Sequence, residues 1–155
     1  MARDTTLYLL ESLGLTVNYA KSVLKPEQKL EYLGIEINTQ MMNLKLPEKK
    51  IKQLKDVCLN MIKVTETTAR KLSQTIGKLA ATATAVFPTP LYLRHLQRLL
   101  KNSLRKNMSY EARIKLNPQA MEEISWWIEN LQQHNGKPMT LSTPDLIVSS
   151  DDSLE

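Results

Sequence analysis

Apolar residues recur every three or four positions along much of the chain, which is the spacing of one face of an α-helix. A first helix is expected to end at Gly14, a residue that readily takes the left-handed conformation of a helix end. Two further helices are expected after Pro47, taken as a first helical residue, and after Thr65, taken as an N-cap. Another long helix would run from about 91 to 106, and a last one would begin after the N-cap residue Asn117.

Strand-forming residues gather in the front part of the chain, in the runs 15–19, 30–37 and 42–46. The last two runs are separated by the short segment 38–41, and this arrangement predicts a β-hairpin. The expected fold class is therefore mainly α with a small antiparallel β element, in which a helical bundle is preceded by a β-hairpin.

Charge is distributed unevenly along the 155 residues. Residues 45–113 hold fifteen Lys and Arg against four Asp and Glu, a net charge of +11, whereas 1–44 carry −1 and 114–155 carry −5. A helical middle with so large a positive excess points to a polyanionic partner. A well-solvated helix surface is the alternative interpretation of the same charges.

The most regular basic pattern lies in the helix expected over about 91–106. Its members are Arg94, Arg98, Lys101 and Arg105, spaced four, three and four apart, so they share one helix face. Such a face fits phosphate contact, because Arg side chains bind phosphate oxygens in a bidentate manner. Further basic residues of the other helices are expected to help: Lys49, Lys52, Lys55, Arg70 and Lys78.

No catalytic constellation is apparent. Asp151 and Asp152 are the only adjacent carboxylates, and two-metal chemistry needs several that converge. His95 and His134 lack a second ligand at metal spacing, and Cys58 is the only cysteine. Because the chain has no cysteine pair, no secretory segment and no apolar run of about 20 residues, an intracellular location, cytoplasm or nucleus, is expected.

Four blocks of sequence together resemble reverse transcriptases of retrotransposons. The first block is similar to the end of the palm in the gypsy-like and DIRS-like groups, and comprises Leu10–Asn18, Lys21-Ser22, Pro26–Gln28 and Tyr32–Gly34. The other three are most similar to the DIRS-like group: Phe87–Tyr92, Trp126-Trp127 and Ser150–Ser153. The similarity covers nearly the whole chain.

The resemblance implies a role for several of these residues. Lys21 would be the lysine near the leaving pyrophosphate, and Tyr32, Leu33 and Gly34 would belong to the primer grip. Asp151 would be a vestigial first metal ligand of ribonuclease H, although Asp152 departs from the small residue usual at that place. The implied domains are a palm remnant (1–46), a thumb-like helical bundle (47–109), a connection (110–144) and the start of ribonuclease H (145–155).

The resemblance also implies what the chain does. The remaining metal-binding carboxylates would precede residue 1 or follow residue 155, so we expect neither catalysis nor a cofactor, with Mg²⁺ needed only by the full-length enzyme. The expected partner is an RNA–DNA hybrid or DNA duplex, bound with little sequence specificity, and no membrane. An open sheet edge would allow a dimer.

Two other functions compete with duplex binding. One is a retroelement-derived helical protein–protein interaction module without nucleic-acid binding, in which Trp126 and the Met41-Met42 pair are the candidate apolar contacts. The other is a magnesium-dependent nuclease centred on Asp151 and Asp152, which Asp151→Asn would inactivate.

Overall fold

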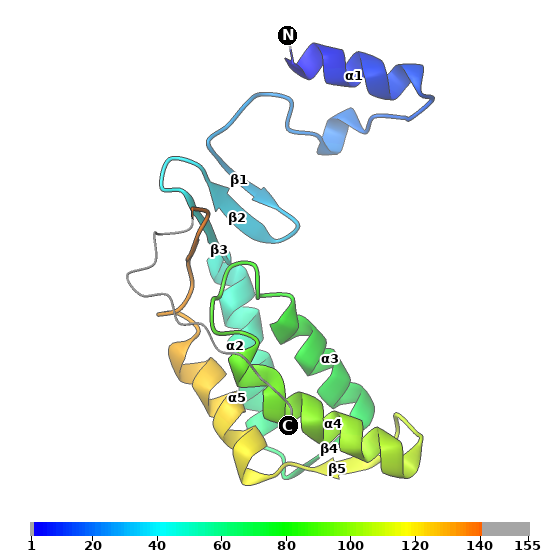
Figure 1. Cartoon of the computed structure of the whole chain (residues 1–155), viewed down its shortest axis with the longest axis vertical. Coiled ribbons are helices and arrows are strands. Elements are labelled where there is room, and N and C mark those ends of the chain that lie inside the picture. Colours follow the sequence, from blue (N-terminus) through cyan, green and yellow to red (C-terminus); the bar gives the residue numbers. More distant parts are fainter. Residues whose placement is uncertain (1, 141–155) are drawn as a thin grey trace, which may run out of the picture.

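The computed structural model describes residues 2–140, and it confirms a mainly helical chain with a small antiparallel β part (Figure 1). The helices are α1 (Ala2–Ser12), α2 (Glu48–Ile62), α3 (Ala69–Ala80), α4 (Arg94–Asn107) and α5 (Pro118–Asn130), with short 3₁₀ turns η1 (Tyr19–Lys21) and η2 (Leu91–Leu93). The strands are β1 (Lys29–Tyr32), β2 (Ile35–Asn38), β3 (Asn43–Lys45), β4 (Glu66–Thr68), β5 (Arg113–Lys115) and β6 (Lys137–Pro138). Within this part of the chain no helix is long and apolar enough to span a bilayer.

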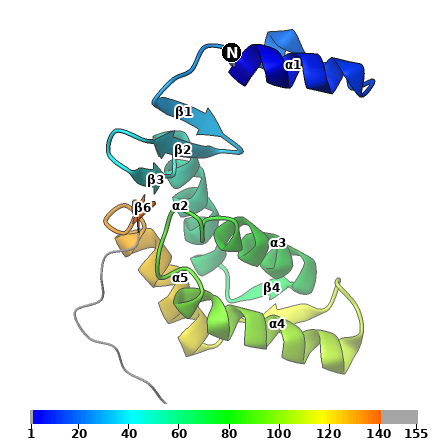
Figure 2. The same cartoon turned by 45° about the horizontal axis from the view of Figure 1, so that its top comes forward.

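Helices α2 to α5 form one bundle (Figure 2). Around the bundle, α2 packs on α3, α3 on α4, α4 on α5 and α5 on α2, so α2 and α4 stand at diagonal corners. The core is built from fully buried side chains such as Leu72, Leu96 and Trp127. It also includes Ile114 and Ile124, so it crosses the boundary expected between the thumb-like and connection-like segments at 109 and 110.

The predicted helix starts are partly confirmed. Asn117 is the N-cap of α5, where its side chain accepts a hydrogen bond from the Ala120 amide at 2.9 Å. Pro47 precedes α2 as its N-cap rather than standing as its first residue. The prediction of Thr65 as an N-cap was wrong: Thr68 caps α3, and the residues before it form β4, paired with β5. A run rich in β-branched residues favours this extended form once a distant strand is there to pair with it.

The front sheet has the strand order β1-β2-β3-β6, and each neighbouring pair is antiparallel. The hairpin between β2 and β3 matches the prediction, but the run 30–37 is not one strand. The chain reverses at Leu33 and Gly34, both with positive φ (52° and 72°), as a two-residue turn of the I′ kind requires. Tyr32 therefore pairs with Ile35.

The strand expected over 15–19 is absent. In its place Asn18 caps the short 3₁₀ turn η1, because its side chain accepts from the Lys21 amide. This local hydrogen bond of an Asn side chain competes with extended structure.

No residue from 2 to 45 is buried, and Leu46 is the first member of the core along the chain. Helix α1 lies away from the bundle in both views (Figures 1 and 2). Most of the exposed large apolar side chains of the described residues belong to this front segment, residues 2–45. The segment therefore presents apolar surface that the other described residues do not cover.

Candidate nucleic-acid interface

The four predicted cations of α4 lie on its outward face. Leu96 is fully buried, and Leu99 and Leu100 pack against the core, so the helix has a defined inner side. Residues 94, 98, 101 and 105 are all exposed on the opposite side, as their spacing requires. They span about 16 Å of helix, at about 1.5 Å per residue. We call these four residues the α4 stripe.

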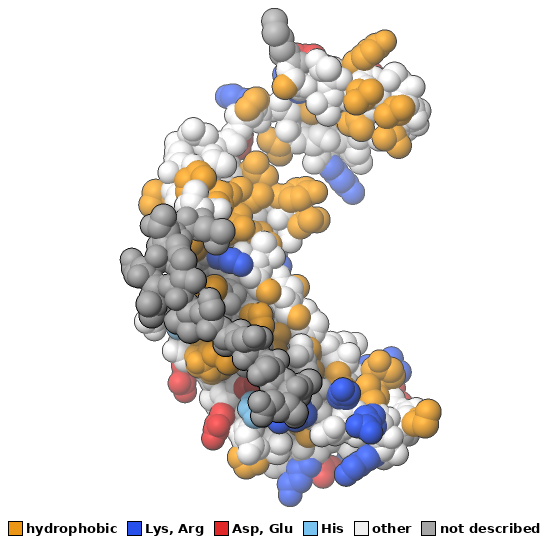
Figure 3. All heavy atoms as spheres, in the orientation of Figure 1, with side chains coloured by type: hydrophobic (Ala, Val, Ile, Leu, Met, Phe, Trp, Pro, Cys, Tyr) orange, Lys and Arg blue, Asp and Glu red, His pale blue; other side chains and the backbone are white. Residues whose placement is uncertain are grey.

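The α4 stripe carries positive charge that the described residues do not neutralise. None of its four side chains is within ion-pair distance of a carboxylate between residues 2 and 140. In the space-filling view, blue side chains gather over the lower end of the molecule, where Figure 1 places α4 (Figure 3). A solvent-facing row of unpaired cations attracts polyanions.

A buried carboxylate on the neighbouring helix holds the start of α4. Leu93, the residue before α4, offers no side-chain cap. Instead Glu123 of α5, which is only 5% exposed, accepts hydrogen bonds from the amides of His95 at 2.8 Å and Leu96 at 2.9 Å. Two otherwise unpaired amides are thereby satisfied, and a negative charge stands at the positive end of the helix dipole. Sequence reasoning missed Glu123, because nothing local distinguishes it from Glu122.

The structure does not bring the lysines of α2 next to the α4 stripe. Lys49 and Lys52 are exposed and Lys55 is half-buried, on a helix that stands diagonally across the bundle from α4. The solvent-facing sides of helices at diagonal corners point in opposite directions. A single straight duplex on the α4 stripe would therefore leave Lys49 and Lys52 out of reach.

Arg70 on α3 is already engaged within the protein. Its Nε donates to the Glu111 carboxylate at 2.7 Å, and its guanidinium lies 5.9 Å from the Tyr110 ring centroid. Phosphate contact by Arg70 would compete with this exposed ion pair, which is weak in water.

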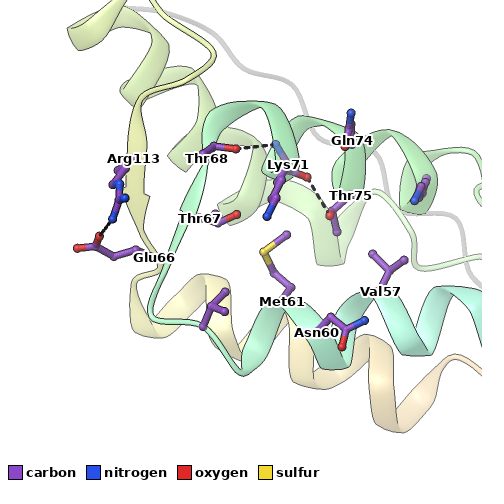
Figure 4. Close-up of a pocket in the computed structure, with 12 residues that line it drawn as sticks. Val57, Asn60, Met61, Glu66, Thr67, Thr68, Lys71, Gln74, Thr75 and Arg113 are labelled. Atoms are coloured by element: carbon purple, nitrogen blue, oxygen red, sulfur yellow. Dashed lines mark hydrogen bonds and ion pairs between the residues drawn. The ribbon is translucent and has the colours of Figure 1, made fainter.

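Lys78, the last of the further basic residues expected to contact phosphate, lines a groove of about 490 Å³ between α2 and α3. Figure 4 shows this groove from the side of Met61 and Lys71. The groove also holds Lys71, and Arg113 at its end pairs with Glu66 at 3.8 Å. The groove is lined by both apolar and polar side chains, which include Val57, Asn60, Met61, Thr67, Gln74 and Thr75. Sequence reasoning omitted Lys71, although its seven-residue spacing from Lys78 was a usable signal. Omitting Arg113 was unavoidable, because β5 reaches the groove only through tertiary pairing.

The residues expected as primer grip form the tip of the β1–β2 hairpin. Leu33 is 80% exposed and Tyr32 is 60% exposed, while the Lys50 ammonium of α2 donates to the Gly34 carbonyl at 3.2 Å. Lys21 is exposed in η1. Their roles toward primer and nucleotide stay predictions.

Trp127 is fully buried in the core, and its indole N–H donates to the Tyr92 carbonyl at 2.9 Å. Trp126 is half-buried and stacks on the Tyr92 ring, with ring centroids 3.8 Å apart, and the His134 ring lies 5.2 Å away. The ring of Trp126 therefore has partners inside the protein, which leaves less of it for stacking on a base. Met41 and Met42 are exposed.

No family model, curated protein or solved structure matches this chain. The relation to retrotransposon reverse transcriptases thus rests on the sequence motifs and stays a prediction.

Groups for metal or nucleophilic chemistry do not converge in the described part of the chain. Between residues 2 and 140 no three His, Cys, Asp or Glu side chains gather where they could hold a metal ion. Burial raises the pKa of the Cys58 thiol to about 12, which leaves it protonated and unreactive at neutral pH. Asp151 and Asp152 lie outside the described residues.

Proposed function

We propose that this chain binds a nucleic-acid duplex, an RNA–DNA hybrid or DNA, without catalysing a reaction, as a part of a retrotransposon reverse transcriptase. The observation that carries the proposal is the α4 stripe, which has four exposed cations and no carboxylate partner within residues 2–140. The sequence motifs that carry the resemblance support the same conclusion. An intracellular location, in the cytoplasm or nucleus, is compatible with this partner.

The length of the α4 stripe suits a duplex. Over about 16 Å, double-stranded DNA presents on the order of ten phosphate charges, at one per ~1.7 Å of helix axis. Contacts of this kind go to the backbone and carry no base information, so binding would show little sequence preference. Since phosphate contacts depend on where the two backbones lie, an A-form-like hybrid would be distinguished from B-form DNA by its groove dimensions.

Fluorescence anisotropy tests the proposal with labelled RNA–DNA hybrid, DNA duplex and single strands, titrated with the full chain at several salt concentrations. Four phosphate contacts predict a slope of about −3.6 in log K against log salt, or a loss of roughly 150-fold between 50 and 200 mM. The triple variant Arg94/Arg98/Arg105→Ala removes three contacts and should reduce the slope to about −1.

A matched control separates contact from net charge. The variant Lys49/Lys52/Lys63→Ala removes the same three charges from α2 and its C-terminal end, at the diagonal corner of the bundle. If the α4 stripe is the interface, this control should keep most of the affinity and slope. Equal losses in the two triple variants, or no binding at low salt, would refute the proposal.

One observation favours a second candidate, the protein–protein interaction module. Residues 2–45 contain no buried side chain, and Met41 at 71% and Leu33 at 80% exposure are typical of its apolar surface. Exposed apolar patches of this kind mark contact sites. Trp126, the other residue expected in such a module, is less available because of its stack with Tyr92. Failure of duplex binding together with capture of a protein partner by residues 2–45 would favour this candidate.

A further inference from the structure

Strand β1 is an edge strand with an unpaired side. It is the first strand in the order β1-β2-β3-β6, and no other described strand pairs with its outer side. Its four residues read Lys29, Leu30, Glu31 and Tyr32, with no proline to block pairing. Exposed edges of this kind are templates for another strand.

The register shows which backbone groups face outward. In the β1–β2 hairpin Leu30 is opposite Ile37 and Tyr32 opposite Ile35, and just beyond the strands the Thr39 amide donates to the Gln28 carbonyl. Bonded and non-bonded pairs alternate in an antiparallel ladder, so residues 28, 30 and 32 direct their backbone groups toward β2. The amides and carbonyls of Lys29 and Glu31 therefore point to the open edge.

The side chains along this edge are poorly matched within one chain. Glu31 lies directly opposite Glu36, a like-charge pair, and Glu36 forms its ion pair with Lys29 at 3.2 Å instead. Glu31 has no ion-pair partner among the described residues. Like charges directly opposite one another destabilise an antiparallel pair.

From these observations we infer that β1 pairs with β1 of a second copy of this chain, antiparallel, with Leu30 on the two-fold axis. In this register Lys29 of each copy is opposite Glu31 of the other, which makes two opposite-charge pairs. The outward backbone groups of Lys29 and Glu31 meet as bonded pairs, while the two Leu30 residues form a non-bonded pair. Such a two-fold contact is isologous, because each copy uses the same surface.

Two further features favour a second copy as the occupant of this edge. The segment 1–44 carries a net charge of only −1, so two such segments can approach although residues 45–113 are strongly basic. Tyr32, which is 60% exposed, would stand opposite Gln28 of the second copy, where part of its own exposed ring would be covered. A contact confined to two four-residue strands should bury less than the roughly 800 Å² per partner of a standard interface, and we expect a dissociation constant on the order of micromolar. This inference does not depend on nucleic-acid binding.

Disulfide trapping tests the register in the full chain. In Leu30→Cys the two Cα atoms across the axis would be about 4.5 Å apart, the spacing of a non-bonded pair, within the range that a disulfide spans. The native Cys58 is fully buried, so it should not form an intermolecular disulfide. Val23→Cys, at a residue that is 67% exposed in the same segment, is the matched control. Under mild oxidation at low micromolar concentration, Leu30→Cys should form covalent dimer at least tenfold faster.

Charge swapping tests the same contact without cysteine, by sedimentation equilibrium. Glu31→Lys places a lysine opposite Glu36 within the hairpin, which favours the fold. The same new lysine faces Lys29 of the second copy, so the dimer should weaken roughly tenfold or more. Lys29→Glu should also weaken it, and the double variant Lys29→Glu/Glu31→Lys should restore it.

Each result decides the question. Rapid trapping at residue 30 together with rescue by the double variant supports the inference. A chain that stays monomeric at about 100 µM, well above the micromolar dissociation constant expected, overturns it. The inference is also overturned if Leu30→Cys forms covalent dimer no faster than Val23→Cys, or if neither charge variant changes the dissociation constant of the dimer. In both cases the two copies would contact each other through another surface.

Discussion

Replacing Glu123 by Ala tests whether one buried carboxylate holds the start of α4. The substitution removes the acceptors of the His95 and Leu96 amides, and Leu96 lies where water cannot replace them, since it is fully buried. A hydrogen bond to a charged group contributes about 1.5–3 kcal/mol, and the favourable interaction with the helix dipole adds up to ~2 kcal/mol in partly buried geometry. Because His95 is exposed, water can accept the hydrogen bond of its amide in the variant, and only the Leu96 amide stays unpaired. We therefore expect a net loss of about 3 kcal/mol in the free energy of unfolding.

The assay is urea denaturation followed by far-UV circular dichroism, with a thermal melt beside it. A loss of about 3 kcal/mol should lower the melting temperature by roughly 10 °C for a chain of this size. Glu123→Gln should lose about half as much, because an amide offers one acceptor oxygen and turns its NH₂ donor toward the second amide.

Glu122→Ala is the matched control, because Glu122 is an exposed carboxylate next to Glu123 on the same helix. Its effect should stay within about 0.5 kcal/mol, as for most surface substitutions. If Glu123→Ala loses less than about 1 kcal/mol, or no more than Glu122→Ala, the reasoning about the tertiary cap is refuted.

Three further predictions concern single positions. Met108 ends α4 with φ 47° and is 91% exposed, so Met108→Gly should raise the free energy of unfolding by about 0.5–1 kcal/mol, and a loss in urea titration would contradict this. Asn117→Ala should lower it by about 1 kcal/mol through the lost cap to Ala120, whereas Asn117→Asp should keep it. Burial raises the pKa of Cys58 from 9.0 to about 12, so its contribution to stability is complete below pH 9 and is lost as pH rises toward 12. Stability should therefore fall by about 1 kcal/mol between pH 8 and pH 10 in the native chain but not in Cys58→Ala, and equal falls in both would refute the assignment.

Local patterns predicted the helices well and the strands less well. The helices around Leu72, Leu96 and Trp127 follow from apolar spacing, because a helix satisfies its own backbone and needs only one buried face. The strands β4 and β5 were missed, since each is three residues long and exists only because the other is there. The turn at Leu33 was missed too, because residues other than glycine seldom adopt a positive φ and a leucine therefore gives no turn signal in the sequence.

The α4 stripe lies where its spacing placed it, because the direction of a side chain around one helix is a local property. Whether that stripe and the lysines of α2 share a surface depends on how the helices are arranged in the bundle. Packing decided that they do not, by placing α2 and α4 at diagonal corners.

The sequence by itself determined the mainly helical class, the outward face of α4 and the cap at Asn117, since each depends on residues within a few positions of one another. Only the tertiary structure decided the cap that Glu123 gives to α4, the α2–α3 groove around Lys71, and the open edge of β1. These features join residues that are distant along the chain, and the free energy of such contacts depends on the packing of the whole bundle.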